Sequence, residues 1–239
     1  MAQFTAEKFL DFIVNYREGN PKQKAAMLEF AQKVLEKQPE LLTDDANWVR
    51  VYRTPVENST ALKVPYFSQR DNYRDAARTC FSSSCAMLLE FMKPGTLPGP
   101  TGDDKYLRKV FSIGDTVSPN VQIQALASFG LEARFITNCT FALLDSQLEK
   151  KKPVPTGILH KGPASAPSGG GHWIIVIGKE KDSKAPGGCW YIVHDPYGEL
   201  SNSSGTYSST DGDNLKYSKS MLSARWTVEG DGSGWAILA

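Results

Sequence analysis

The hydrophobic and polar positions of this chain follow helical spacing in its first two thirds and strand-like runs towards its end. The spacing predicts helices at residues 80–91, 106–111, 121–129 and 141–150. Short apolar runs predict strands at residues 131–136, 153–160, 173–177, 190–193, 225–228 and 235–238. Helices followed by an antiparallel sheet are typical of the α+β class.

The first 59 residues form a separate, charged segment. Thr5 is a candidate cap for one helix, Asn20 and Pro21 open a second, and a short piece follows at residues 48–52. A polar linker at residues 57–62 then predicts two parts, an N-terminal helical segment at 1–59 and a larger domain at 60–239. We interpret the segment as a structural brace for the larger domain. A separate targeting module is the alternative, although no known binding repeat is visible.

Charge and hydropathy exclude several partners. The net charge is +1 and no long basic run occurs, so a nucleic-acid partner is not indicated. No stretch is long and apolar enough to span a bilayer, and the N-terminal sequence lacks the pattern of a signal peptide. We therefore expect a monomer that is made in the cytoplasm and does not insert into membranes.

The cysteines and histidines do not predict a metal centre. The chain has four cysteines and three histidines, at Cys80, Cys85, Cys139, Cys189, His160, His172 and His194. They show neither a Cys-x-x-Cys pair nor the ligand spacing of a zinc site. We expect free thiols and no metal or other cofactor. Cys85 lies among apolar residues, so it is interpreted as a buried thiol.

Three residues stand in contexts that suit nucleophilic catalysis. Cys80 lies in TCFSSSCAMLLEFM, where a loop turns into a helix, and the small serines after it leave it unshielded. Unpaired N–H groups at a helix start favour a thiolate, which is the nucleophilic form. His172 follows three glycines and opens an apolar run, and Asp195 closes the next one. The imidazole is suited to move the thiol proton, and the carboxylate to orient the imidazole.

Other residues are candidates for binding the substrate. Gln69, upstream of the nucleophile, is a candidate donor to the oxyanion. Gly170 and Gly171 leave room for a substrate backbone, and Trp173, Tyr66 and His160 are candidate contacts. We assign the base to His172 rather than to His160, because glycines precede His172 and a buried strand follows it. Strand alternation directs His194 away from Asp195.

Four segments of the chain resemble a known family. The segments VPYFSQ, TCFSSSCAML, GGGHWIIVIG and IVHDPYG resemble papain-like cysteine peptidases typified by the leader peptidases of bacteriocin exporters, and more specifically a stand-alone phage branch identified as lysins. The resemblance covers residues 64–239. It implies a papain-like fold, in which a nucleophile helix packs on an antiparallel sheet, and the roles given above to Gln69, Cys80, His172 and Asp195. Many relatives have glycine and proline where this chain has Phe81 and Ser82.

The resemblance also implies a substrate. We expect a cysteine endopeptidase that hydrolyses peptide bonds of bacterial peptidoglycan, a phage endolysin that leaves the host cytoplasm by holin-type release. One alternative is an amidase or a peptidase that processes a leader peptide or another protein, although leader peptidases usually precede exporter segments. Another is a catalytically silent binding protein of a virion or cell surface, which the intact series of Cys80, His172 and Asp195 disfavours.

Overall fold

The computed structural model describes residues 61–201 and 204–239. All of them belong to one unit, Thr60–Ala239. The helices and the short piece predicted within residues 1–59 lie outside the described residues. Within the described part of the chain, no helix is long and apolar enough to cross a membrane.

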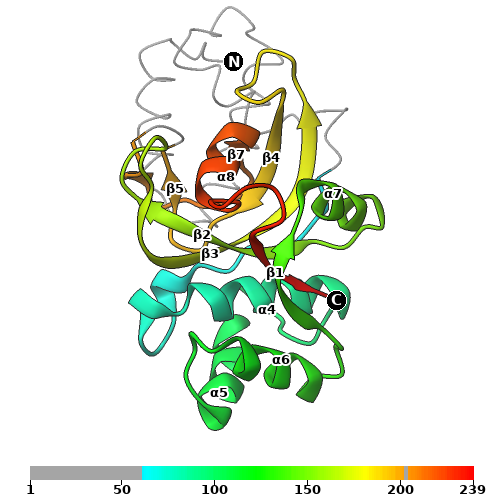
Figure 1. Cartoon of the computed structure of the whole chain (residues 1–239). Helices are drawn as coiled ribbons and strands as arrows, with labels where there is room; N and C mark the ends of the chain where they lie inside the picture. The colour runs from blue at the N-terminus through cyan, green and yellow to red at the C-terminus, as the bar shows by residue number, and fades with distance from the viewer. Residues whose placement is uncertain (1–60, 202–203) are drawn as a thin grey trace, which may run out of the picture. The chain divides into compact units, whose positions relative to one another are not determined.

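A six-stranded antiparallel sheet forms the centre of the unit (Figure 1). Its strands in spatial order are β1 (Arg134–Cys139), β8 (Gly234–Leu238), β2 (Val154–Lys161), β3 (Ser168–Lys181), β4 (Cys189–His194) and β7 (Leu215–Ser218). A separate pair consists of β5 (Glu199–Leu200) and β6 (Tyr207–Ser209). The long strand β3 pairs with both β2 and β4, so it connects the two halves of the sheet.

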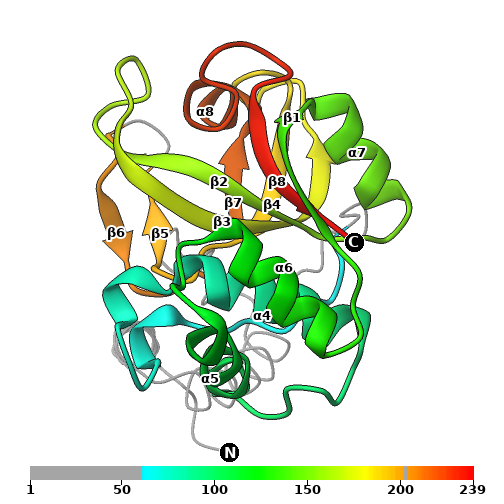
Figure 2. The ribbon, with the colours of Figure 1, turned by 60° about the horizontal axis from the view of Figure 1, so that its bottom comes forward.

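Helices cover both faces of the sheet (Figures 1 and 2). On one face lie α4 (Cys80–Met92), α5 (Asp103–Ile113) and α6 (Pro119–Ser128), and on the other lie α7 (Phe141–Glu149) and α8 (Lys219–Arg225). Side chains of β3 alternate between the two cores, with Trp173 and Ile175 in the first and Ile174 and Val176 in the second. This arrangement is the expected α+β architecture.

Helix α4 is enclosed on every side. Residues 80–89 are all buried, which is typical of a helix at the centre of a domain rather than at its surface. Two short 3-10 turns, η2 (Gln69–Asp71) and η3 (Ala76–Arg78), lead into it. The helix packs against β2 and β3 and therefore holds its first residue in a fixed place beside the sheet.

The predicted strand at residues 225–228 is wrong. Residues Lys219–Arg225 form α8, and the hydroxyl of Ser218 caps this helix by accepting the N–H of Met221 at 3.1 Å. Met221, Leu222 and Arg225 are buried, and their spacing is helical rather than alternating.

The predicted strand at residues 131–136 begins three residues later, at Arg134. Gly130 has a φ of +76°, and the N–H of Leu131 donates to the carbonyl of Leu126 at 3.1 Å. These contacts complete the C-terminal cap of α6, so residue 131 belongs to the helix end.

The predicted strand at residues 173–177 begins earlier in the structure. Strand β3 begins at Ser168, so the three glycines are part of the strand that carries His172. Gly171 pairs with Leu159, and Ser168 pairs with Lys161. The hairpin between β2 and β3 therefore extends beyond His172 as an ordered ladder.

Candidate active site

Cys80 is the first residue of α4 and lines an open cavity of about 600 Å³. A residue at this helix position has a backbone N–H without an intrahelical acceptor, and the helix dipole favours negative charge there. The cavity is lined by Gln69, Ala77, Arg78, Cys80, Phe81, Val117, His160, Lys161, Gly171, His172, Trp173, Tyr197, Gly205, Tyr207 and Trp235. The thiol and His172 thus face the same space.

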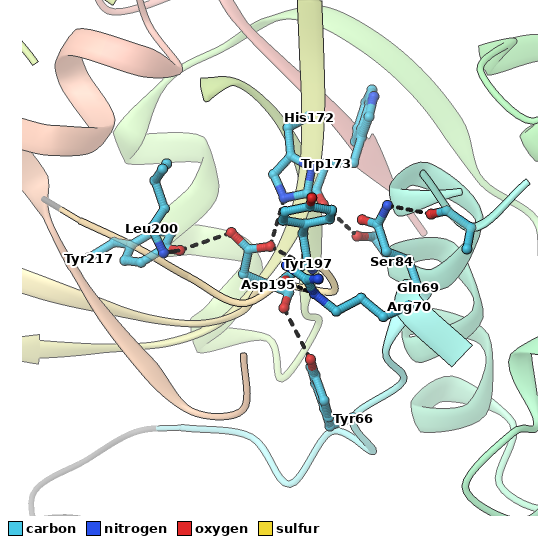
Figure 3. Close-up of polar contacts among 11 residues, drawn as sticks. Tyr66, Gln69, Arg70, Ser84, His172, Trp173, Asp195, Tyr197, Leu200 and Tyr217 are labelled. Carbon is cyan, nitrogen blue, oxygen red and sulfur yellow. Dashed lines mark hydrogen bonds and ion pairs between the residues drawn. The ribbon is translucent and has the colours of Figure 1, made fainter. Parts of the chain in front are cut away.

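His172 and Asp195 form a buried hydrogen-bonded pair (Figure 3). The Nε2 atom of His172 lies 2.7 Å from Oδ1 of Asp195. The two residues come from adjacent strands, because β3 pairs with β4 and Asp195 directly follows β4. The other ring nitrogen, Nδ1, is thereby left for the thiol of Cys80. The structure brings together the three residues in which the sequence analysis placed the chemistry.

The carboxylate of Asp195 is fully enclosed and held by further donors. Its Oδ1 also accepts the N–H of Tyr197 at 2.9 Å, and its Oδ2 accepts the hydroxyl of Tyr217 at 2.9 Å. The hydroxyl of Tyr217 in turn accepts the N–H of Leu200 at 3.0 Å. The sequence analysis missed Tyr217, because its strand β7 reaches the site only through the pairing of β7 with β4.

The electrostatics of the pair favour a charged imidazole. Burial of His172 lowers the pKa of its ring, but the neighbouring Asp195 and Cys80 raise it, and the net effect raises the pKa to about 10. His172 is therefore protonated at neutral pH and faces Cys80. This is the arrangement in which a thiolate is stabilised as the partner of an imidazolium.

Gln69 lies beside Cys80 in the lining of the cavity. Its backbone N–H donates to the carbonyl of Pro196 at 3.0 Å, which ties η2 to the turn after Asp195. Its Nε2 donates to the carbonyl of Ala76 at 2.7 Å. A primary amide has two N–H groups, so one remains for the oxyanion. The role of Gln69 stays a prediction.

The serines after Cys80 anchor the helix. The hydroxyl of Ser82 is hydrogen-bonded to that of Thr116 at 2.6 Å. The hydroxyl of Ser83 donates to the carboxylate of Asp103 at 2.7 Å, and that of Ser84 donates to the carbonyl of Trp173 at 3.2 Å. The sequence analysis treated them only as small neighbours. The structure shows that they tie the nucleophile helix to its surroundings.

One of these contacts leads into a buried polar network. The amide of Asn72 donates to the hydroxyls of Thr79 and Ser83, at 2.8 and 3.0 Å, and Ser83 donates to Asp103. Burial raises the pKa of Asp103 to about 7, against an ordinary value of 3.8, although the bond from Ser83 lowers it. The start of α4 is therefore hydrogen-bonded, through Ser83, to a carboxylate whose ionised form is destabilised by burial.

The predicted substrate contacts divide into two groups. Gly171, Trp173 and His160 line the cavity. Gly170 does not, although a Cβ atom at Gly170 or Gly171 would meet nothing within 4 Å, which confirms open space above this strand.

The structure corrects the prediction for Tyr66. Its hydroxyl donates to the backbone carbonyl of Asp195 at 3.3 Å (Figure 3). Its ring packs edge-on against His194, with centroids 5.7 Å apart. Tyr66 therefore supports the turn that carries Asp195 and lies outside the cavity lining.

Phe81 and Trp173 form one wall of the cavity. Their rings stack with centroids 3.6 Å apart and an interplanar angle of 3°. Val117 and Trp235, both about half exposed, extend this wall. The sequence analysis missed Val117 and Trp235, because they come from distant elements and only the fold brings them to the site.

The remaining thiols and His194 do not reach the cavity. Burial raises the pKa of the Cys85 thiol, which is fully enclosed, and raises that of Cys139 to about 11. His194 faces away from Asp195, as expected, and its Nε2 donates to the carbonyl of Val64 at 2.9 Å. In the described ranges, no group of three or more His, Cys, Asp or Glu side chains is arranged to hold a metal ion.

Comparison with known proteins agrees with this geometry. A family model described as "Papain-like cysteine protease AvrRpt2" matches residues 58–210, which is more than half of the chain. A solved structure of digestive procathepsin L2 proteinase from the larval midgut of Tenebrio molitor shares 13% identity and a TM-score of 0.40 over 98% of each chain. No curated protein sequence matches the chain. The family match extends over Gln69, Cys80, His172 and Asp195, and the chain belongs to the papain-like cysteine protease family typified by AvrRpt2.

Proposed function

We propose that this protein is a cysteine endopeptidase that hydrolyses peptide bonds of bacterial peptidoglycan, in the role of a phage endolysin. The observation that carries the catalytic part is the meeting of Cys80, at the start of α4, with the buried pair of His172 and Asp195. We assign the catalytic domain to residues 60–239.

The geometry supports a two-step reaction. The thiolate of Cys80 attacks the scissile carbonyl carbon, and the oxyanion receives N–H groups from the start of α4 and from Gln69. The carbon–nitrogen bond breaks as imidazolium His172 gives its proton to the leaving amine, which leaves a thioester on Cys80. Water, deprotonated by His172, then attacks the thioester, and the acid product leaves as the thiolate is restored.

The carboxylate of Asp195 keeps the imidazole in the required orientation throughout. Its bond to Nε2 directs Nδ1 towards Cys80, and the donors from Tyr197 and Tyr217 fix the carboxylate itself. Asp195 also stabilises the imidazolium that must be present before the amine leaves.

Two features support a wall peptide as substrate. The first is the resemblance of the motifs around Gln69, Cys80, His172 and Asp195 to those of phage lysins. The second is charge, because the described residues of the cavity lining include Lys161 and Arg78, which is paired with Asp115 at 3.0 Å, and no acidic side chain. Stem peptides carry free carboxylates that suit a basic rim. As a lysin, the protein would accumulate in the host cytoplasm and reach the wall by holin-type release.

A second candidate is the processing of another protein or of a leader peptide. The family match favours it, since the matching model describes a protease without reference to the cell wall. Both candidates use the same chemistry and differ only in the chain that enters the cavity.

Digestion of purified peptidoglycan separates the two candidates. Full-length protein and the Cys80→Ala variant are incubated with peptidoglycan of several cross-link types and with a tryptic peptide library, and new termini are identified by mass spectrometry. New termini in peptidoglycan with the intact protein only would support the lysin. Cleavage confined to the library would reject the lysin in favour of protein processing.

A further inference from the structure

We propose that Tyr207 and His160 form a polar subsite that binds the substrate peptide group on the leaving-group side of the scissile bond. This inference rests on the proposed cysteine peptidase activity and names two substrate contacts for it. Neither contact depends on whether the substrate is a wall peptide or a protein.

The two side chains reach the cavity from different elements. Tyr207 begins β6, and His160 lies near the end of β2, where the hairpin with β3 extends beside the small β5–β6 sheet (Figure 2). Their ring centroids lie 6.4 Å apart, and each ring approaches His172, at 6.1 Å for Tyr207 and 5.5 Å for His160. Both residues line the cavity that contains Cys80.

Both side chains have a buried polar atom without a hydrogen-bond partner in the described structure. These atoms are the hydroxyl oxygen of Tyr207 and Nδ1 of His160. A buried polar group without a partner is costly, so native proteins rarely keep one without a reason. Tyr217 offers a contrast in the same site, because its hydroxyl donates to Asp195 and accepts from Leu200. Because both residues line one cavity, a substrate bound there is placed to supply the missing hydrogen-bond partners.

The charge state of the two groups indicates what they bind. Burial, and then the neighbouring His172, lower the pKa of His160, so its ring is neutral at pH 7. Burial, and then Asp195, raise the pKa of Tyr207, so its hydroxyl keeps its proton. A neutral imidazole nitrogen and a hydroxyl complement the N–H and C=O of a neutral peptide group, rather than a charged side chain.

The position of the pair assigns it to the leaving-group side. His172 must give its proton to the leaving amine, so that amine lies against the imidazole. Tyr207 and His160 both approach this ring, whereas Phe81 and Trp173 build the apolar wall of the cavity. The first peptide group beyond the leaving amine is therefore the one within reach of the pair.

A buried arginine fixes the hairpin that presents His160. The guanidinium of Arg225 donates to the carbonyls of Leu159, Lys161 and Gly162, at 3.1, 3.3 and 2.6 Å. These carbonyls flank His160 in the chain. The hairpin is thus held in place before substrate arrives, which lowers the entropic cost of binding.

The test compares two substrates with the same acyl side. One is a peptide that the wild-type protein cuts in a tryptic library, and the other replaces all residues after the scissile bond with aminomethylcoumarin. Tyr207→Phe and His160→Phe should each lower kcat/KM for the peptide about 3- to 10-fold, the loss expected for one hydrogen bond. For the coumarin substrate, kcat/KM should change less than about 2-fold in both variants.

The matched control is Tyr217→Phe. It removes from the same site a hydroxyl that does have hydrogen-bond partners. It should lower activity on both substrates alike, because it acts through Asp195. Tyr207→Phe should leave the thermal midpoint unchanged or raise it, since it removes an unpaired buried group. Equal losses on both substrates for Tyr207→Phe and His160→Phe would overturn the subsite. If wild-type protein cuts no peptide of the library from which the first substrate is chosen, the proposed peptidase activity itself has failed.

Discussion

The Nε2 atom of His172 lies 2.7 Å from Oδ1 of Asp195, in a pair that is almost completely enclosed. Because the same carboxylate also accepts from Tyr197 and Tyr217, both of its oxygens are occupied. The orientation of the imidazole therefore depends on one side chain that is itself held by two further donors.

Asp195→Asn should retain more activity than Asp195→Ala. The amide oxygen of asparagine can still accept from His172 and Tyr197, so the ring stays oriented, while the charge and the acceptor for the hydroxyl of Tyr217 are lost. We expect kcat/KM to fall about 100- to 10,000-fold for alanine, the range for losing a positioned proton-transfer group, and to fall less for asparagine. Peptide hydrolysis by both variants is the measurement. Equal losses would mean that Asp195 does not act by orienting His172.

Cys80→Ala should abolish turnover, whereas Cys85→Ala should keep most of it. Cys80 lines the cavity, but Cys85 is fully buried and its pKa is raised by burial, so it cannot supply a reactive thiolate. Iodoacetamide should label Cys80 first, as measured by peptide mapping after short exposures. Faster labelling of Cys85, together with an active Cys80→Ala variant, would reverse the assignment.

The activity should fall on the alkaline side as His172 loses its proton. Its pKa is raised to about 10 in the folded protein, above the ordinary 6.5, so the imidazolium persists through neutral pH and is lost as the pH rises through 10. Asp195 raises this pKa, so Asp195→Asn should shift the alkaline limb of kcat/KM to lower pH. Profiles of both proteins provide the check, and an unshifted limb would contradict the assigned cause.

Asp103→Asn should stabilise the protein at neutral and higher pH. The folded pKa of Asp103 is about 7, above the ordinary 3.8, so its contribution to stability is present below pH 3.8 and is lost as the pH rises through 7. Asparagine keeps an acceptor for Ser83 without the buried charge. Urea unfolding at pH 8 should show a gain of at least about 1 kcal/mol over wild type, and little gain at pH 4. A loss at pH 8 would mean that the charge itself holds the network.

Local sequence patterns sufficed for the elements that carry the catalytic residues. The helix that starts at Cys80, the strand that contains His172 and the strand that precedes Asp195 have strong apolar runs, so these elements could be predicted. The prediction of a strand at residues 225–228 was wrong because Ser218 caps helix α8, whose buried face includes Arg225. A charged residue on a buried face is not expected from hydrophobic periodicity.

The rest of the site depends on long-range contacts. Tyr217 and Tyr207 reach His172 and Asp195 only after β7 pairs with β4 and β6 pairs with β5. No local motif marks either tyrosine. For the same reason, the sequence could not show that Tyr66 lies outside the cavity lining, because Tyr66 is near Gln69 in the chain. In the structure its hydroxyl contacts the backbone of Asp195 instead.

The central claim is that Cys80, activated by His172, forms a thioester with the substrate. The most direct test is the mass of the full-length enzyme, quenched in acid within seconds of mixing with a peptide that it cuts, followed by mapping of the modified residue. The account predicts an acyl adduct on Cys80 that disappears on longer incubation and is absent from Cys80→Ala, which should also be inactive. Turnover by Cys80→Ala, or an adduct on Cys85, Cys139 or Cys189 instead, would contradict it.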